Sequence, residues 1–398
     1  MTVGPRGPAG PTPAQLKAAG LVAVTTYEAI QTAYANGQGP LRTWDTRHQN
    51  FPTVNSGYVK AAPVTPPPPP PPPTTAGLPF MLGVNSHMIN EGTVNTVAIA
   101  AAVSMGMKVY RNDLIWNNST IAIQTSPGVY NMGQLASVQR TVAALKAAGI
   151  TPLICVTGGF STTPGSTPQD LANTMTWLVS QSGLQGLHWE IINEPDGSNT
   201  TPAQLTQTMK LAYPAMKKAD PTCVVHGLCL MHAAPAGYGN GMDYYNACVA
   251  LGIVGNYDVL SIHDYNNNNV NYDVDLAPDS LVNNPWQMTM AQRFTHFHAN
   301  MLAKGDSVPI WITECNWPRT GGNMTPALQS QYLKALLTEL SGNDSTGVAF
   351  SSYIKAFCIY QMYGSVDGNW GLYPADFPGP YINPEPAVAM LTALTKGT

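Results

Sequence analysis

The sequence is poor in charge, in long apolar runs and in paired cysteines. Only 10% of its 398 residues are charged and the net charge is -4, which argues against a basic surface for nucleic acid. No apolar stretch approaches the roughly 18 residues that a membrane span needs. The first ten residues, M-T-V-G-P-R-G-P-A-G, show no cationic segment followed by an apolar run, so no secretion signal is visible. This composition favours uncharged partners such as sugars.

The six cysteines give no sign of a metal site or a disulfide framework. None of them forms a C-x-x-C pair, so zinc is not indicated and we expect no cofactor. Four lie inside strand-like runs, where free thiols behave as small hydrophobic side chains: Cys155, Cys229, Cys315 and Cys358. We therefore predict buried core thiols.

The N-terminal part of the chain differs in composition from the rest. Gly4–Thr12 reads G-P-R-G-P-A-G-P-T, which is three triplets of collagen type. Pro66–Pro73 is a run of eight prolines, which predicts a stiff polyproline spacer of about 25 Å. A ligand for a proline-binding module is the alternative, but a folded domain begins directly after the run. We predict an attachment segment at 1–62, a linker at 63–76 and the main domain at 77–398.

Strand-like and helix-like segments alternate from Gly77 to the end. The eight predicted strands are Phe80–Ser86, Lys108–Asp113, Thr151–Thr157, Leu187–Glu194, Cys223–Leu230, Tyr257–Tyr265, Ile310–Cys315 and Lys355–Met362. The predicted helices include Leu135–Ala148, Pro168–Ser182, Pro202–Lys218, Ala291–Lys304, Pro326–Leu340 and Pro386–Leu394. Eight such units in about 320 residues predict an α/β fold, the (β/α)8 TIM barrel. A doubly wound sheet is the alternative, but no G-x-G-x-x-G follows the first strand.

Two of the predicted strands end on glutamate. H-W-E-I-I-N-E-P-D contains Glu194 and I-W-I-T-E-C-N-W contains Glu314, in a chain that has only seven glutamates. The carboxyl ends of barrel strands gather at one mouth, where these folds place their chemistry. Two carboxylates there are the minimum set for cleaving a glycosidic bond. Glu194 could instead cap the following turn, but that reading does not account for Glu314.

Further polar side chains are expected at the same mouth. They end the other predicted strands and comprise Asn85, His87, Arg111, Asp113, Asn193, His263, Tyr265, Gln361 and Tyr363. Glu190, four residues before Glu194, lies within its strand. We predict that Glu190 is a structural charge inside the barrel, paired with Arg111.

These motifs together resemble the clan A retaining glycoside hydrolases, most closely their family 39 and family 5 branches. The resemblance runs from Gly77 to the end and rests on N-E-P after strand four, T-E on strand seven, H-x-Y on strand six and the arginine on strand two. It implies that Glu194 is the acid/base and Glu314 the nucleophile. It also implies that Asn193 binds the sugar 2-hydroxyl, that Arg111 keeps Glu314 ionised, and that His263 and Tyr265 orient Glu314.

The resemblance carries expectations about pKa and about strand eight. We expect a lowered pKa for Glu314 and a raised one for Glu194, because a nucleophile must be ionised and an acid protonated. Many clan members end strand eight on a tryptophan beneath the reacting sugar. Gln361-Met362-Tyr363 stands there in this chain, with Trp370 beyond it.

Aromatic residues near the mouth predict a sugar-binding cleft. Four tryptophans lie in or beside the loops that follow strands: Trp116, Trp286, Trp317 and Trp370. Core filling is the alternative for each one alone, but four at such positions favour stacking against sugars. Tyr363 and Asn85 are further candidates for substrate binding, and for His87 substrate contact and a structural hydrogen bond are equally favoured.

The leading functional hypothesis is a retaining, endo-acting hydrolase of an extracellular or cell-surface polysaccharide. A non-catalytic carbohydrate-binding or structural protein is the alternative. The collagen-like triplets and the linker resemble the attachment end of a phage tail or baseplate protein. This indicates a virion-associated or extracellular depolymerase docked to a larger assembly, with a trimer as the oligomer that such triplets favour. A bacterial secreted enzyme is the rival source.

Overall fold

The computed structural model describes eleven segments: residues 21–24, 42–43, 57–60, 77–117, 119–160, 166–233, 241–265, 289–317, 325–363, 370–373 and 386–397. Residues 1–74 belong to one compact unit, and residues 75–275 and 285–398 to another. In the first unit, β1 (Leu21–Val24), β3 (Gly57–Lys60) and β2 (Arg42–Thr43) form an antiparallel sheet in that order. The collagen-like triplets and the proline run lie outside the described residues.

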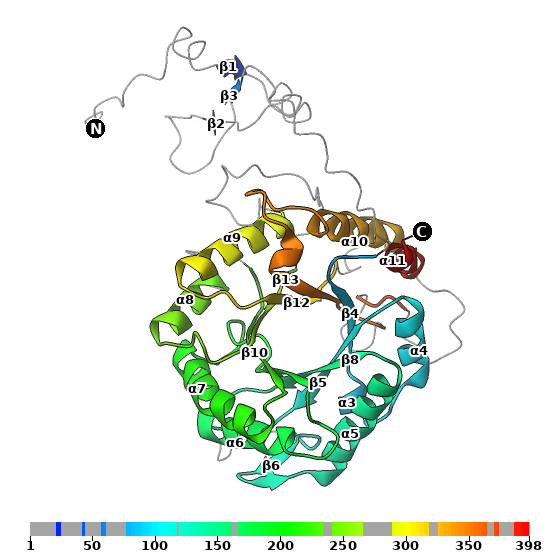
Figure 1. Cartoon of the computed structure of the whole chain (residues 1–398), viewed down its shortest axis with the longest axis vertical. Coiled ribbons are helices and arrows are strands. Elements are labelled where there is room, and N and C mark those ends of the chain that lie inside the picture. The colour runs from blue at the N-terminus through cyan, green and yellow to red at the C-terminus, as the bar shows by residue number, and fades with distance from the viewer. Residues whose placement is uncertain are drawn as a thin grey trace, which may run out of the picture. The chain divides into compact units, whose positions relative to one another are not determined.

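The second unit is a closed barrel of eight parallel strands ringed by helices (Figure 1). Around the ring the strands are β10 (Val224–Leu230), β11 (Val259–His263), β12 (Ile310–Cys315), β13 (Ile354–Ile359), β4 (Met81–Ser86), β5 (Val109–Ile115), β8 (Thr151–Thr157) and β9 (His188–Ile191). The prediction of a (β/α)8 barrel with these eight strands is confirmed. Two boundaries are wrong: β9 ends at Ile191 and β13 at Ile359, each three residues before the predicted end.

The helices of the barrel follow the predicted order. They are α3 (Met88–Glu91), α4 (Thr96–Ser104), α5 (Met132–Ala147), α6 (Pro168–Val179), α7 (Pro202–Ala219), α8 (Met242–Ala250), α9 (Met290–Ala303), α10 (Pro326–Leu340) and α11 (Pro386–Lys396). A small hairpin, β6 (Gln124–Ser126) and β7 (Val129–Tyr130), and a short 3₁₀ helix, η3 (Phe350–Ser352), complete the described elements. Capping boxes of Thr167 with Asp170 and of Thr201 with Gln204 begin α6 and α7, because each pair satisfies amide groups of the first helical turn.

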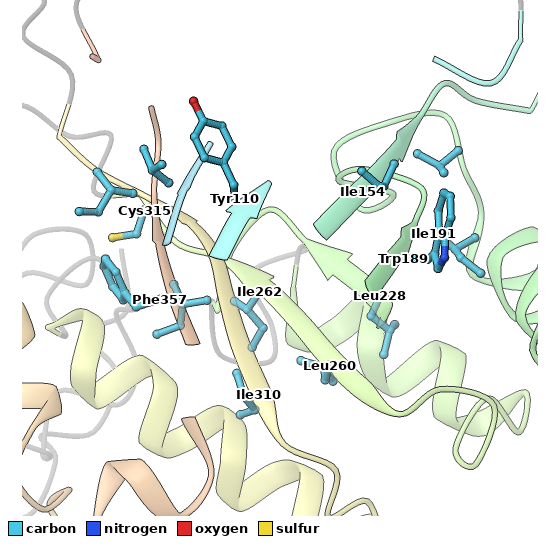
Figure 2. Packing of buried hydrophobic residues seen from close by; sticks show 14 of the residues in the cluster. Tyr110, Ile154, Trp189, Ile191, Leu228, Leu260, Ile262, Ile310, Cys315 and Phe357 are labelled. Carbon is cyan, nitrogen blue, oxygen red and sulfur yellow. The ribbon is translucent and has the colours of Figure 1, made fainter. Parts of the chain in front are cut away.

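Side chains alternate between the two faces of each strand. Outward-facing residues pack with the helices in one large buried cluster, and Figure 2 shows part of it, from Trp189 and Ile191 of β9 to Phe357 of β13. A smaller cluster of Val109, Leu153, Val259, Trp311, Ala356 and Cys358 fills the barrel interior. All six cysteines are buried free thiols, as predicted.

The first and last strands of the barrel close the ring. Ala356 of β13 pairs with Met81 of β4, and the hydroxyl of Thr395 near the end of α11 donates to the carbonyl of Met105, at 2.9 Å. A Cβ added to Gly77, just before β4, would lie 3.8 Å from the carbonyl oxygen of Thr395. The two ends of the barrel therefore meet. No helix among the described residues is long and apolar enough to cross a bilayer.

Candidate active site

The backbone beyond β9 turns Asn193 and Glu194 toward the mouth. Ile192 and Glu194 both adopt left-handed conformations, with φ of 65° and 45°, which non-glycine residues rarely occupy. The amide of Asn193 donates to Val156 of β8, and the amide of Glu194 donates to Cys229 of β10, at 3.1 and 3.0 Å. Because neighbouring strands hold this turn on both sides, Glu194 is fixed in place.

Arg111 of β5 is the centre of the site and is almost fully buried. Its Nε donates to Glu190 at 2.5 Å, one Nη donates to Glu314 at 2.7 Å, and the other donates to the side-chain oxygen of Asn193, at 2.7 Å. A guanidinium carries five donors in a rigid fork, so one side chain can hold all three acceptors. Arg111 thereby brings two other predicted site residues, Asn193 and Glu314, to its own position.

Tyr265 and His263, both near the end of β11, hold the two glutamates. The Tyr265 hydroxyl donates to Glu314 at 2.5 Å. His263 Nδ1 lies 2.9 Å from Glu194 Oε1, and its Nε2 lies 3.6 Å from Glu314 Oε1. His263 therefore bridges the pair, whereas the sequence assigned it to Glu314 alone. One oxygen of each glutamate and one ring nitrogen of His263 all lie within 4.8 Å of one another.

The expected order of the two glutamate pKa values is reversed in the free site. Burial raises the pKa of Glu314, and the charges of His263 and Arg111 offset only part of that effect. Burial also raises the pKa of Glu194, but the hydrogen bond and charge of His263 outweigh it and leave the pKa below its ordinary value. The Glu194 side chain is 25% exposed and that of Glu314 only 9%, so desolvation acts more strongly on Glu314.

The pKa of His263 is raised in this environment. Burial alone would lower its pKa, but the charge of Glu314 and hydrogen bonds with Cys229 and Glu194 raise it well above its ordinary value. Cys229 Sγ lies 3.3 Å from His263 Nε2. The carboxylates of the site therefore have two basic side chains beside them, Arg111 and His263.

Glu190 lies beneath this pair, as predicted. It is fully buried and bonded to Arg111, and its pKa is lowered because Arg111, His263 and His226 outweigh the effect of burial. Its strand position inside the barrel keeps it from the mouth. Glu190 therefore balances the charge of Arg111.

Two groups of three side chains in the described residues are spaced closely enough to ligate a metal. They are Glu194, His263 and Glu314 at the mouth, and Cys155, Glu190 and Cys229 beneath it. Arg111 bonds to a carboxylate of each group, at 2.5 and 2.7 Å. Its permanent positive charge opposes a metal ion in either place.

A cleft of about 470 Å³ opens beside Glu194. It is lined by the loops after β8 and β9, namely Thr157–Phe160, Asn193, Glu194 and Gly197–Asn199. A volume in this range suits a small molecule or a sugar unit. Glu194 borders this cleft, whereas Glu314 does not line it.

The remaining predicted contacts divide into exposed and buried residues. His87 is partly exposed and bonds to Asp113, whereas Asn85 is 2% exposed and donates to the carbonyl of Thr313, at 3.0 Å. Trp370 is partly exposed and packs edge-on against Tyr265, with ring centres 5.0 Å apart.

Two tryptophans and one tyrosine that the sequence analysis proposed as sugar contacts are buried. Trp116 and Trp317 are 0% and 2% exposed, because their rings fill the core and are not open to a sugar. Tyr363 is 3% exposed, and its hydroxyl donates to Glu91. Trp286 lies outside the described residues.

The sequence alone did not identify Tyr360, and it placed Asp113 at the mouth without a role. Tyr360 follows β13 and is partly exposed, and its ring lies edge-on to those of Tyr265 and Trp370, at 6.2 and 6.0 Å. Asp113 lies two residues after Arg111, on the same face of β5, and 3.5 Å from its guanidinium. The spacing R-x-D on one strand was the available signal for Asp113.

The comparisons with known proteins agree with this geometry. A family model described as cellulase, glycosyl hydrolase family 5, matches residues 74–353. Comparison with curated proteins gives no match.

Among solved structures, the fold is similar to a family 39 glycoside hydrolase from the gut symbiont Bacteroides cellulosilyticus WH2, with a TM-score of 0.58 and 21% identity over 80% of this chain. This chain covers 64% of that protein. It is also similar to a β-glucosidase from Thermotoga maritima, with a TM-score of 0.56 and 11% identity. This match covers 80% of this chain and 98% of that protein. A doubly mutated β-glucosidase from Trichoderma harzianum is similar as well, with a TM-score of 0.55 and 14% identity. That match covers 80% of this chain and 98% of the other. At these identities the likeness concerns the fold.

Proposed function

Because this chain belongs to the cellulase family, glycosyl hydrolase family 5, and is a glycosidase, we propose that it hydrolyses a polysaccharide with retention of anomeric configuration. One observation carries the proposal. Carboxylate oxygens of Glu194 and Glu314 lie within 4.8 Å of each other at the mouth. Retaining enzymes hold their two carboxyl groups about 5–5.5 Å apart, whereas inverting enzymes need roughly 6.5–9.5 Å to admit a water molecule.

In the first step, Glu314 attacks the anomeric carbon while Glu194 protonates the departing glycosidic oxygen. Arg111 and Tyr265 both donate to Glu314, at 2.7 and 2.5 Å, and these bonds stabilise its carboxylate. The step forms an ester between the sugar and Glu314 and releases the leaving sugar as an alcohol. In the second step, Glu194 takes a proton from water, and the resulting hydroxide displaces Glu314 from the sugar.

The lowered pKa of Glu194 requires a source for the proton that it delivers. His263 supplies one, because its Nδ1 lies 2.9 Å from Glu194 and its pKa is raised. Transfer of this proton makes Glu194 a neutral acid and His263 a neutral imidazole. The second step returns the proton, so the His263–Glu194 pair ends as it began.

The cleft beside Glu194 supports endo action, because it provides room for a leaving sugar chain. Gly159 in this cleft tests the idea. A Cβ added there meets no atom within 4 Å, and the Gly159 backbone is not left-handed. Gly159→Phe should fill the cleft and lower the rate of polysaccharide cleavage by at least about 10-fold, while hydrolysis of a glycosyl fluoride, whose leaving group is small, stays within about 2-fold. Gly159→Ala is the matched control, and equal losses on both substrates would contradict endo action through this cleft.

The overall proposal is tested by digesting a panel of bacterial surface and plant polysaccharides. Release of reducing ends identifies hydrolysis, and proton NMR of the first product shows whether its anomeric configuration is retained. A product of inverted configuration would contradict the double displacement. Binding without new reducing ends would support the non-catalytic alternative.

We also propose that residues 1–62 attach the enzyme to a larger, virion-associated assembly. The collagen-like triplets and the proline run support this, together with the division of the chain into two compact units. All eight barrel strands come after Gly77. A truncated chain that starts at Gly77 should therefore be monomeric and fully active on a soluble oligosaccharide, and light scattering should show a trimer only for the full chain. Loss of activity on truncation would contradict the modular arrangement.

A further inference from the structure

Three neighbouring strands place polar and aromatic groups on the Glu314 side of the mouth that the proposed mechanism does not use. β13 pairs with β4, and β4 pairs with β5. Tyr360 and Gln361 follow β13, His87 follows β4, and Asp113 lies in β5. The cleft beside Glu194 lies instead after β8 and β9. The glycone, which is the sugar that becomes bound to Glu314, must occupy the Glu314 side.

Asp113 is held against this side by two contacts. Its Oδ2 lies 2.8 Å from His87 Nδ1, and its Oδ1 lies 3.5 Å from the same Arg111 nitrogen that is 2.7 Å from Glu314. The side chains of His87 and Asp113 are 19% and 17% exposed, so a ligand at the mouth can reach them. Asp113 and Glu314 thus share one guanidinium nitrogen.

An aromatic wall stands beside the His87–Asp113 pair. The Tyr360 ring lies edge-on to His87, with ring centres 6.3 Å apart, and edge-on to Tyr265, which holds Glu314. Buried polar atoms accompany this wall. Both side-chain polar atoms of Gln361, which is 1% exposed, and the side-chain oxygen of Asn85 have no hydrogen-bond partner among the described residues. Their burial closes these atoms off from the mouth, so a ligand there meets the partly exposed His87 and Asp113 instead.

Among the described residues on this side, the carboxylates of Asp113, Glu190 and Glu314 surround the guanidinium of Arg111. Within the described residues, Arg111 is the sole lysine or arginine in an ion pair with Asp113, Glu190 or Glu314. The Arg111 guanidinium already contacts all three carboxylates, so it is not free to bind the carboxylate of an anionic sugar. A carboxylate such as Asp113 has acceptor capacity for about four hydrogen bonds, of which His87 and Arg111 use two.

We propose that Asp113, positioned by His87, binds neighbouring hydroxyl groups of the glycone and makes this subsite selective for uncharged sugars over uronic acids. The inference rests on the proposed function, since it assumes that Glu314 attacks the glycone. Hydroxyl groups donate strong charge-assisted bonds to a carboxylate. A sugar carboxylate near Asp113 and Glu314 is repelled instead.

The test uses the full chain, with aryl glycosides of neutral hexoses and pentoses, the matching glucuronide, and monodeoxy versions of the neutral substrate that is cleaved. Asp113→Asn should lower kcat/KM on the neutral substrate by about 10- to 100-fold, because an amide presents one acceptor in place of two. One deoxy substrate should show a similar loss with the native protein, and no further loss with Asp113→Asn. The native protein should have a higher kcat/KM for the neutral substrate than for the glucuronide. Asp113→Asn should lower the ratio of these two kcat/KM values at least about 10-fold.

Asp258→Asn is the matched control, because Asp258 pairs with Lys217 just before β11, away from the strand ends that form the mouth. It should leave kcat/KM unchanged on every substrate. A native protein that cleaves no glycoside contradicts the proposed function itself. An active protein that hydrolyses the glucuronide as fast as the neutral glycoside, or in which Asp113→Asn loses activity equally on all deoxy substrates, overturns the role of Asp113 alone.

Discussion

Two buried histidines in the barrel interior have opposite properties. His263 lies at the mouth, and His226 lies nearer the floor, the end of the barrel opposite the mouth. Both are 0% exposed, and burial favours the neutral form of each. The pKa of His263 is nevertheless raised, because carboxylate oxygens of Glu194 and Glu314 lie 2.9 and 3.6 Å from its nitrogens. The pKa of His226 is lowered by burial and by its neighbour His188. Counter-charge, more than depth, decides where this barrel carries charge.

The two histidines nearer the floor, His188 and His226, have lowered pKa values and bond to each other. His226 bonds to His188 at 2.9 Å and to the Ser261 hydroxyl at 3.0 Å. His188 stacks on Trp311, with ring centres 4.6 Å apart. The mouth instead concentrates charge around Arg111. We therefore expect changes at the mouth to lower activity, and also stability where they leave a buried charge unpaired, whereas changes at the floor should leave activity intact.

The largest effect is expected from Glu314→Ala. It removes the proposed nucleophile and little packing, so hydrolysis should fall by roughly 10⁴-fold or more. Azide should partly restore turnover of an activated aryl glycoside and give a product of inverted configuration. Thermal unfolding should stay close to that of the native protein. Near-native turnover would show that Glu314 is not the nucleophile.

Arg111→Met should disturb both activity and folding. It leaves Glu190 buried without its ion pair, which costs about 3–5 kcal/mol of unfolding free energy. Lys217→Met is the control at the floor end, where the ion pair with Asp258 is 29% and 26% exposed and contributes at most about 1 kcal/mol. Urea unfolding measures both variants, and equal losses would erase the proposed difference between the two ends.

The pH dependence of the mouth provides a third test. Glu314 must be ionised to attack, and its pKa is raised, so kcat/KM for a glycosyl fluoride should fall as pH drops through a value above the ordinary glutamate pKa of 4.5. Glu194→Gln removes a neighbouring negative charge and should move this acid limb to lower pH. An acid limb that stays in place or moves upward would contradict the coupling of the two carboxylates.

The smallest effect is expected at the floor. Burial lowers the pKa of His188 from its ordinary value of 6.5 to about 4, so the unfolded chain binds more protons between these values. The unfolding free energy should therefore decline as pH falls from 6.5 toward 4. His188→Phe keeps a ring against Trp311 and should show less of this decline, with native activity at pH 7. Identical pH dependence in both proteins would assign the decline to other groups.

The fold was predictable because its signals are local. β-branched runs mark the strands, and threonine–proline caps mark the starts of α6, α7 and α10. The boundary of β9 was not predictable, because Ile192 has strong strand propensity and yet adopts φ of 65° in a turn held by β8 and β10. Tertiary contacts override local preference there.

The composition of the site was predictable, and so were the contacts of Arg111 with Glu190 and Glu314 and of Tyr265 with Glu314, but other connections were not. Strand ends identified Glu194, Glu314 and Arg111, whereas the bridging position of His263 depends on the relative placement of β9, β11 and β12. The burial of Trp116 and Trp317 depends on loop paths that no spacing reveals. The reversed order of the glutamate pKa values follows from differences in exposure, which a sequence does not contain.

The approach of Gly77 to Thr395 brings the two ends of the barrel segment together in space, although no covalent bond joins them. A short peptide could join these two places, and the chain could then begin at another surface connection, since natural domains with adjacent ends tolerate such circular permutation. A permuted barrel would keep Arg111, Glu194 and Glu314 on the same strands while changing which loop carries an attached partner. The direction in which the mouth of the barrel faces relative to an attached partner is thus a property that can be changed separately from its chemistry.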